Sequence, residues 1–590
     1  MLASGTGVRS ILTPFLYAGL CLLMRRAEKT PVRSRSLPLI IGALLYTAAV
    51  TLAVYERAAA EFTGFLFRAG TLVILLAGTF LLSYHTLRLL TALLSDGRAE
   101  RLLRGDGAQT AGPKTAFFRR HLLPVSFAVC LVCYLPWYLY SWPGIFSPDP
   151  VNQVEQVLGL VPLSNHHPIA HTVLIGLWMR IAGLFTADLT TAVGVYTFFQ
   201  MTLFAFSAAF VVFTMDRVFG LRPAVCLCVL AFYALLPFMP VFSILVCKDT
   251  VFASVLMLFC CEIARFLRFG LPRFTPAGIL HDAVFVLLGI LVCLLRTNGW
   301  YAFWLFAVCF VFVFRRKLQR ALPPVIAIFV AAALIRGPLM DAAGVIKPDT
   351  VESLHIPMQQ IAQVLAYGRA LPDEDRAMIE AVTDTTWVSE LYVPGFADNI
   401  KELIRAGHPE VIEADKAGYL KLWIRIGLRY PGDYISAWAA QIRGVTWPDV
   451  PAEVAVIEGV YPNTIGLEYR PLIGGAVLVK LRELIMKLGG FVPLYGLLWS
   501  MGFWAWVLLF SGVLILTQGK GRRRLLLLVP AGALIATLLI ATPISDDFRY
   551  AFPFITLAPF NLCTMTISLF ANANLCYNEK SADSTDKIDR

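Results

Sequence analysis

The chain has 590 residues, of which 58% are apolar and only 15% are charged, and its mean hydropathy is +0.70. This composition is far too apolar for several ordinary soluble domains, so lipid is expected to be the solvent for much of the chain. The net charge of +11 lies mainly in Arg and Lys clusters beside apolar runs, which is typical of cytoplasmic loops and argues against nucleic-acid binding.

Apolar runs long enough to cross a bilayer recur along the chain, and we count about thirteen of them. They cover residues 11–24, 37–55, 69–90, 122–140, 190–215, 223–241, 250–266, 280–295, 299–314, 322–335, 491–516, 525–541 and 551–570. The sequence therefore predicts an all-α polytopic membrane protein with about thirteen transmembrane helices.

A further apolar stretch, residues 169–185, is left out of this count because of the positive charges. The basic loops at 25–35, 88–120, 265–273, 315–320 and 520–524 all fall in the cytoplasm only if this stretch does not cross. The stretch is short and contains His171 and Arg180, so we predict an amphipathic helix on the membrane surface. The alternative is a real crossing, with a neighbouring run wrongly divided.

This topology places six segments on the extracytoplasmic side, at 56–68, 141–189, 247–249, 296–298, 339–490 and 545–550. The largest, 339–490, has helical patterns interrupted by Pro and Gly, which predicts an α-rich extracytoplasmic domain. Its apolar stretch 477–488 contains spaced Lys and Arg and is expected to lie on the membrane. The twelve cysteines lie almost entirely in apolar runs, without metal-type spacing, and are interpreted as small buried side chains.

The first large loop contains SPDPVNQVEQ and then LSNHHPIAH. Asp149 lies between two prolines, which keep the backbone extended and hold the carboxylate near the membrane surface. Its alternative role is structural, as the cap of a helix that starts near residue 151. His166 and His167 are adjacent and point to opposite sides, so hydrogen bonding to a substrate or to the loop is predicted rather than a shared metal.

Polar residues also occur where later spans begin on the same side. They are Lys248 and Asp249, Arg296 and Asn298, and Asp547, Arg549 and Tyr550. Charges this close to hydrocarbon are costly unless they are paired or used, and the structural alternatives are mutual salt bridges or helix caps. We expect these residues to converge on one membrane face, where a carboxylate acts as general base and cations bind a phosphate. The absence of a Walker loop, a GxSxG elbow or an HExxH helix in a suitable context argues against nucleotide hydrolysis, an α/β-hydrolase or a zincin.

The stretches SPDPVNQ, NHHPIAHTVLIGLWMRIAGLF, DRVFGLRP, CKDTVF and DDFRYAFP together resemble the GT-C superfamily of membrane glycosyltransferases, which use polyprenyl-phosphate or related lipid-linked sugars. With RTNGWY, IPMQQIAQVLAYG and LRYPGDYISAW, they look like an uncharacterised bacterial family of multispanning proteins distantly related to those enzymes. The resemblance covers about residues 120–560. It implies a GT-C-like helical bundle.

The apolar runs, the charges and the resemblance together predict five domains or segments. They are N-terminal transmembrane helices with a basic cytoplasmic loop (1–121), a GT-C-like transmembrane core with the first outer loop 141–189 (122–338), an extracytoplasmic mostly helical domain (339–490), C-terminal transmembrane helices (491–570) and a polar cytoplasmic tail (571–590).

The resemblance also implies roles for matching residues. Asp149 matches the first-loop acid, the general base that deprotonates the acceptor hydroxyl, and His167 matches the His-Pro that follows it. Asp249 matches the second-loop acid, while Arg549 and Tyr550 resemble an Arg-Tyr pair near the donor phosphate. The chain departs from the pattern because prolines flank Asp149 where a DxD-like pair would have a second acid. No metal site is assigned, and dependence on Mg²⁺ or Mn²⁺ stays open.

The expected function is inverting transfer of a sugar from a polyprenyl-phosphate-type donor to an extracytoplasmic acceptor, namely an envelope glycan, a glycolipid or a protein. Lys248, Arg296 and Arg549 are expected to stabilise the lipid-phosphate leaving group, and 339–490 to shape the acceptor site. The expected partners are the bilayer, the lipid-linked donor and the envelope acceptor.

Two alternatives remain. A polymerase or ligase of lipid-linked glycans would use a diphosphate donor and more Arg in the large loop. A lipid or solute transporter without catalysis would place its ionisable residues at mid-membrane in broken helices, often with repeated halves.

Overall fold

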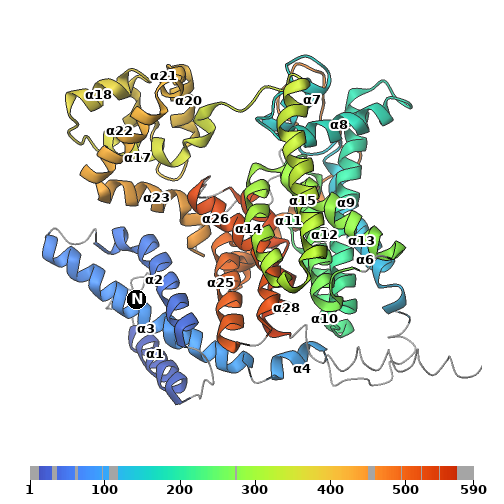
Figure 1. Cartoon of the computed structure of the whole chain (residues 1–590), viewed down its shortest axis with the longest axis horizontal. Helices are drawn as coiled ribbons and strands as arrows, with labels where there is room; N and C mark the ends of the chain where they lie inside the picture. Colours follow the sequence, from blue (N-terminus) through green and yellow to red (C-terminus); the bar gives the residue numbers. More distant parts are fainter. Residues whose placement is uncertain are drawn as a thin grey trace, which may run out of the picture.

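The computed structural model describes residues 12–29, 36–59, 64–95, 97–104, 119–272, 275–448, 459–492, 494–519, 521–541 and 547–567, and the single residues 117, 543 and 545. Throughout this part of the chain the regular structure is helical, and β-pairing is limited to isolated bridges (Figure 1). This agrees with the predicted all-α fold. The predicted tail at 571–590 lies outside the described residues.

Eight helical segments in the described part are long and apolar enough to cross a membrane. Seven of them are single helices, namely α2 (Ser36–Ala59), α3 (Phe65–Ser95), α6 (Leu122–Tyr140), α9 (Leu189–Arg217), α12 (Lys248–Phe269), α13 (Pro276–Leu295) and α25 (Met501–Gln518). The eighth is the continuous segment Arg315–Ala342, which consists of η2 (Arg315–Lys317), α15 (Leu318–Leu334), η3 (Ile335–Leu339) and α16 (Met340–Ala342). This number of apolar helices is consistent with a multi-pass membrane protein.

A ninth span arises if α10 (Pro223–Leu235) and α11 (Phe238–Ile244), which meet at a bend of 55°, are counted together. The bend lies at Leu236, which has an extended backbone because it precedes Pro237. The structure thus supports fewer spans than the thirteen predicted, and that count is not confirmed.

The remaining predicted spans form shorter helices. α14 (Thr297–Val313) has 17 residues, the lower limit for a helix that crosses the hydrocarbon core, and α26 (Val529–Ile540) has only 12. The predicted span at 551–570 is divided between α27 (Phe548–Ile555) and α28 (Ala558–Thr566), and residues 568–570 lie outside the described part. α1 (Leu12–Lys29) ends in basic residues.

The stretch 169–185 forms α8 (Ile169–Ala182), which follows α7 (Pro148–Val157). Figure 1 shows both at one end of the bundle, which we call the α7 end. The 14 residues of α8 span about 21 Å as a helix, less than the hydrocarbon thickness of about 30 Å. This length is consistent with the predicted surface helix.

A helical domain, residues 350–446, lies beside the α7 end (Figure 1). We call it the α17–α23 domain. It contains η4 (Thr350–Ser353), α17 (His355–Ala366), α18 (Asp373–Glu380), η5 (Thr385–Trp387), α19 (Val388–Leu391), α20 (Asp398–Ala406), α21 (Pro409–Ala414), α22 (Lys416–Arg429) and α23 (Pro431–Thr446). α23 packs against α2 and α25, which anchors the domain to the bundle. After it come α24 (Ala476–Phe491), η6 (Tyr495–Trp499) and η7 (Arg522–Leu527).

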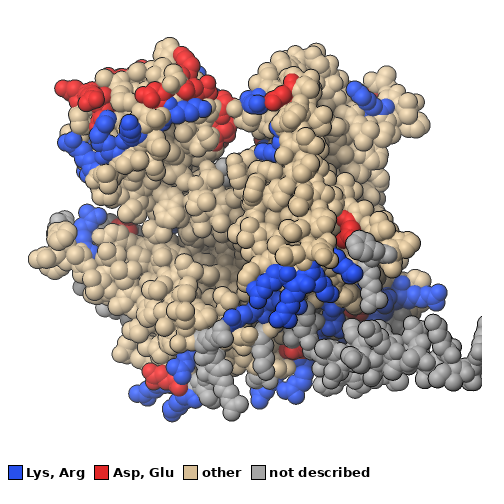
Figure 2. Space-filling view, in the orientation of Figure 1, with Lys and Arg blue, Asp and Glu red and all other residues tan. Residues whose placement is uncertain are grey.

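Basic residues gather at the end of the bundle away from the α17–α23 domain (Figure 2). Arg315, Arg316, Lys317 and Arg320 are exposed between α14 and α15. α4 (Arg98–Arg104) adds further Arg side chains. α14 therefore runs from the predicted site at Arg296 to this basic end.

Candidate functional site

Four helices begin with residues of the predicted site in their first turn. They are α7 with Asp149, α12 with Lys248 and Asp249, α14 with Asn298, and α27 with Arg549 and Tyr550. The first turn of a helix has unpaired N–H groups and a partial positive charge, both of which favour anions. Polar side chains at these starts lie outside the apolar middle of each helix.

The predicted extended backbone at Asp149 is wrong, and so is its alternative as a helix cap, because α7 begins at Pro148 and proline is tolerated in the first turn of a helix. Asp149 is nevertheless the most accessible carboxylate of the group, with 44% of its side chain exposed. Its Oδ1 lies 3.8 Å from His167 Nε2, and its Oδ2 lies 3.7 Å from Arg549 Nη1. Burial by itself would raise the pKa of Asp149, but His167, Lys248 and Arg549 outweigh it and hold the pKa below its usual value. The carboxylate is therefore ionised at neutral pH.

His167 links Asp149 to the start of α12. The imidazole is buried, and its Nδ1 lies 3.3 Å from Lys248 Nζ. Burial and the charge of Lys248 lower the pKa of His167 to about 4, so the ring is neutral at pH 7 and Nδ1 accepts a hydrogen bond from the ammonium. His166 is exposed, and its ring meets that of His167 edge-on at 4.6 Å. The prediction that the two histidines point to opposite sides is therefore wrong, because their rings lie against each other, although His166 is exposed and His167 is buried.

A buried ion pair lies beside this surface group. Asp249 Oδ1 is 2.5 Å from Arg296 Nη1, and both side chains are only 5% exposed. The Arg296 guanidinium also lies 5.0 Å from the centre of the Tyr550 ring and 5.8 Å from that of Phe252, both within cation–π range. Because removal of either charge would leave the other buried and unpaired, this pair holds the starts of α12, α14 and α27 together.

Arg549 connects two carboxylates. Its Nη2 lies 2.6 Å from Asp547 Oδ2, while its Nη1 faces Asp149. Asp547 also caps α27 by accepting a hydrogen bond from the backbone N–H of Arg549 at 2.9 Å. Its neighbour at 546 lies outside the described residues. Asn298 is buried in the first turn of α14, two residues after Arg296.

Backbone pairing places the Asp149 loop against the start of α12. Ile145 N–H donates to Ile244 O at 3.1 Å, and Val246 N–H donates to Ile145 O at 3.0 Å. On the other side, Phe146 exchanges hydrogen bonds of 2.8 Å with residues 459 and 461. Three segments far apart in the sequence are thus held side by side just before Asp149.

A buried hydrogen-bond network lies beneath the loop and was not predicted. Gln153 Oε1 accepts from His171 Nδ1 at 2.8 Å, and His171 Nε2 accepts from the Tyr196 hydroxyl at 2.7 Å. Burial lowers the pKa of His171 to about 3, so the ring is neutral. The network joins α7, α8 and α9 and positions α7. The available signal was that His171 follows His167 by four residues, about one helical turn.

The α17–α23 domain reaches the site through η4, which also was not predicted. Leu163 and Asn165 pair with the backbone of Ile346, just before η4. Burial would raise the pKa of Glu352 in η4, but Lys401, Arg405 and His166 outweigh it and lower the pKa. The backbone pairing at Ile346 thus brings η4 close to the loop that contains His166. Nothing in the sequence indicated this proximity, because the two segments are far apart in the chain.

The described residues contain no group of three or more His, Cys, Asp or Glu side chains that could hold a metal ion. At the candidate site two side chains of these types, Asp149 and His167, lie together, with Asp149 Oδ1 3.8 Å from His167 Nε2.

Comparison with known proteins identifies a family. A model described as a family of unknown function (DUF6020) matches residues 160–587, a stretch that includes all the predicted site residues except Asp149. No curated protein and no solved structure matches the chain.

Proposed function

The chain belongs to the DUF6020 family, whose description assigns no activity, so we propose a function from the candidate site. We propose that the protein is a membrane glycosyltransferase that uses a polyprenyl-phosphate-type sugar donor and an extracytoplasmic acceptor. The main support is an ionised, half-exposed carboxylate, Asp149, surrounded by His167, Lys248 and Arg549. A base beside a cationic phosphate site is what such a transfer requires.

The proposed reaction is a single displacement with inversion. Asp149 takes the proton of the acceptor hydroxyl, whose oxygen attacks the anomeric carbon of the donor sugar. The bond from that carbon to the phosphate oxygen breaks, and the lipid phosphate leaves with the electron pair. Lys248 and Arg549 stabilise the charge that develops on this phosphate, because preorganised cations need little reorganisation during the reaction.

The buried pair of Asp249 and Arg296 has a different role in this proposal. Both side chains are almost completely buried, so they act as positioning residues that hold the first turns of α12 and α27. Arg296 was expected from the sequence to stabilise the leaving group directly. Its burial favours an indirect role.

The proposed side is extracytoplasmic, because the exposed basic residues between α14 and α15 lie at the opposite end of α14. The position of the site also favours an enzyme over a transporter. Its ionisable residues lie in the first turns of helices and in loops, whereas transporters place such residues in broken helices near mid-membrane.

The direct test compares the surface glycans and glycolipids of cells with and without the protein by mass spectrometry. The proposal expects one glycan species to lose a single sugar, and the purified protein to restore it when a polyprenyl-phosphate sugar is supplied. If instead the protein moved a labelled lipid or solute across proteoliposomes and formed no product, the transporter alternative would replace this proposal. A requirement for a diphosphate donor would favour the polymerase or ligase.

A further inference from the structure

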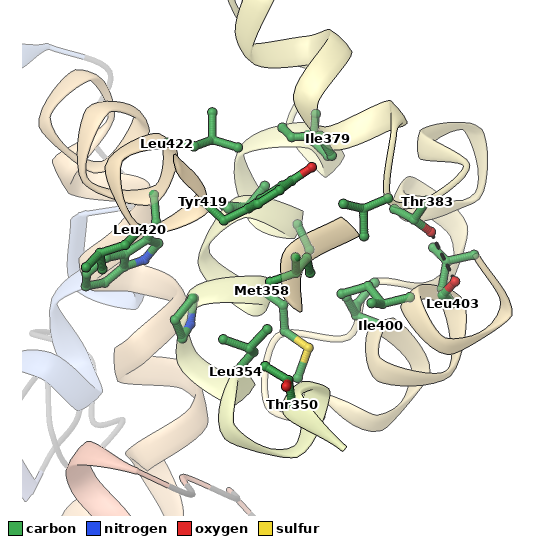
Figure 3. Close-up of a pocket in the computed structure, with 18 of the residues that line it drawn as sticks. Thr350, Leu354, Met358, Ile379, Thr383, Ile400, Leu403, Tyr419, Leu420 and Leu422 are labelled. Carbon is green, nitrogen blue, oxygen red and sulfur yellow. Dashed lines mark hydrogen bonds between the residues drawn. The ribbon is translucent and has the colours of Figure 1, made fainter. Parts of the chain in front are cut away.

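An apolar cavity of about 390 Å³ lies inside the α17–α23 domain, separate from the polar site. α17, α20 and α22 form its walls, and Figure 3 shows Leu354, Met358 and Ile400 pointing into one space with the Tyr419 ring across it. Its size is typical of a site for one small ligand, for which about 300–1,000 Å³ is usual. Protein interiors are normally close-packed, so an apolar space of this size suggests an occupant.

The hydroxyl groups of the cavity wall are already hydrogen-bonded within the protein. Thr383 donates to Leu403 O at 3.1 Å, the dashed line in Figure 3, and Thr350 donates to Glu413 at 2.7 Å. Ser353 donates to the backbone carbonyl of Thr350 at 2.7 Å. A sugar, a nucleotide or a peptide backbone would lose its hydrogen bonds with water and find few replacements here. The wall therefore suits a ligand without polar groups along its length.

One cation marks the opening of the cavity. Lys416 is the charged member of the described lining and is exposed at the start of α22. Leu420, one turn later, both lines the cavity and is 55% exposed, so the space opens at this face of α22. An apolar interior with a cation at its mouth fits an amphiphile with an anionic headgroup.

The same face of α22 has the pattern of a membrane-surface helix. Leu420, Ile424 and Leu428 form an exposed apolar stripe at spacings of four residues. A basic stripe of Lys421, Arg425 and Arg429 lies beside it, although Arg425 is also paired with Asp375. Apolar residues next to Lys and Arg on one helix face suit an interface with anionic lipids.

The rest of the molecule holds this domain beside candidate membrane spans. α23 directly follows α22 and packs against α2 and α25, two candidate membrane spans. In Figure 2 the blue side chains of this domain lie mainly below the red ones, toward α2 and α3. The charge of the domain is therefore oriented for contact with anionic headgroups.

We propose that this cavity binds one acyl chain of an anionic phospholipid from the leaflet beside the α7 end, with the headgroup held at Lys416. The chain needs no hydrogen bonds, and it covers an apolar wall that would otherwise face water. This site does not depend on the glycosyl transfer proposed above, since it shares no residue with the polar site.

The test uses the full chain in nanodiscs that contain phosphatidylglycerol with a diazirine on its acyl chain. After irradiation and proteolysis, mass spectrometry should find adducts on peptides of α17 and α22, as well as on the spanning helices. Ala362→Trp fills the cavity and should abolish the α17 and α22 adducts. Lys416→Glu should reduce them severalfold, while Lys421→Glu, an exposed lysine on the same helix outside the lining, should leave them unchanged.

Adducts on the spanning helices serve as the internal standard in every variant. Because Trp at a buried position could unfold the domain, the exposed Lys416→Glu provides the independent test. The proposal fails if α17 and α22 stay unlabelled in the unmodified protein, or if labelling is equal in all three variants. Equal labelling by the zwitterionic phosphatidylcholine analogue would overturn the assignment of an anionic headgroup.

Discussion

Asp149 has two properties that a general base needs, namely an ionised carboxylate and an open side. His167 and Arg549 approach its two oxygens at 3.8 and 3.7 Å, distances that allow attraction without the short hydrogen bonds that would occupy the lone pairs. The carboxylate can therefore still accept a proton from a substrate.

Replacing Asp149 by Asn should remove the base while keeping the shape of the side chain. Sugar transfer by the purified protein should fall by roughly 10²- to 10⁴-fold, the usual contribution of general-base catalysis. Glu155→Gln removes a half-buried acid on the same helix and should leave the rate close to that of the unmodified protein. Equal rates in Asp149→Asn and the unmodified protein would show that Asp149 is not the base.

Lys248 should set the acidic limb of the pH–rate profile. Its charge helps to lower the pKa of Asp149, so Lys248→Met should raise that pKa and move the acidic limb of kcat/KM to higher pH. The base must be deprotonated to act, so the variant loses relatively more activity at low pH. Lys421→Met, in α22, should not move the limb. An unmoved limb in Lys248→Met would contradict the electrostatic coupling.

Most of the site residues could be predicted because a charge beside hydrocarbon is costly and therefore stands out in an apolar sequence. Pairing could not be predicted in the same way. Asp249 pairs with Arg296, and Lys248 approaches His167, partners that depend on how helices pack. Gln153 and His171 were missed because they lie on two different helices, and only their contact reveals a network.

At the scale of the helix, length and proline decide where prediction succeeded. Several long apolar runs without an internal break formed continuous helices, such as α9 and α12. The run at 223–241 contains Pro237 and breaks there, and the last run is split between α27 and α28. Apolar composition predicts that a segment is shielded from water. It does not distinguish one membrane-spanning helix from two short helices that pack inside a bundle.

α23 anchors the α17–α23 domain through a close backbone approach at Gly444. An added Cβ there would lie 1.5 Å from the carbonyl oxygen of Ser545, so Gly444→Ala forces α23 away from the bundle. Overpacking of this kind costs about 1–3 kcal/mol, which should lower the midpoint of thermal unfolding of the purified protein.

Gly432 provides the matched control for this change. It lies in the first turn of the same helix, and an added Cβ would meet nothing within 4 Å. Gly432→Ala should leave the midpoint unchanged or raise it slightly, because Ala favours a helix more than Gly does. A similar decrease in both variants would show that the contact with Ser545 does not anchor the domain.

For the whole molecule, the proposed topology can be checked with introduced cysteines. Ser389 is exposed in the α17–α23 domain, and Arg316 is exposed at the basic end of the bundle. A membrane-impermeant maleimide should label Ser389→Cys in intact cells, but should label Arg316→Cys only after the membrane is permeabilised. The unmodified protein gives the background from its native cysteines. The reverse pattern would invert the topology and place the site in the cytoplasm.

The association of the α17–α23 domain with the bundle is the part of the fold that the sequence did not predict. It depends on contacts across long sequence separations, such as the Ser436 hydroxyl with the Glu56 carboxylate. Helical patterns predicted a helical domain at 339–490, but neither the approach of η4 to the candidate site nor the cavity within the domain follows from periodicity.

The pairing of residues 145–146 with 244–246 and 459–461 also sets an order for biogenesis. The ribosome makes the Asp149 loop early, yet one of its two backbone partners emerges only after some 300 further residues have been synthesised. Until then Phe146 lacks its native hydrogen bonds, and the loop can pair only through Ile145 with residues 244–246. A nascent chain released before residue 461 would insert many of its helices and still leave the candidate site incomplete.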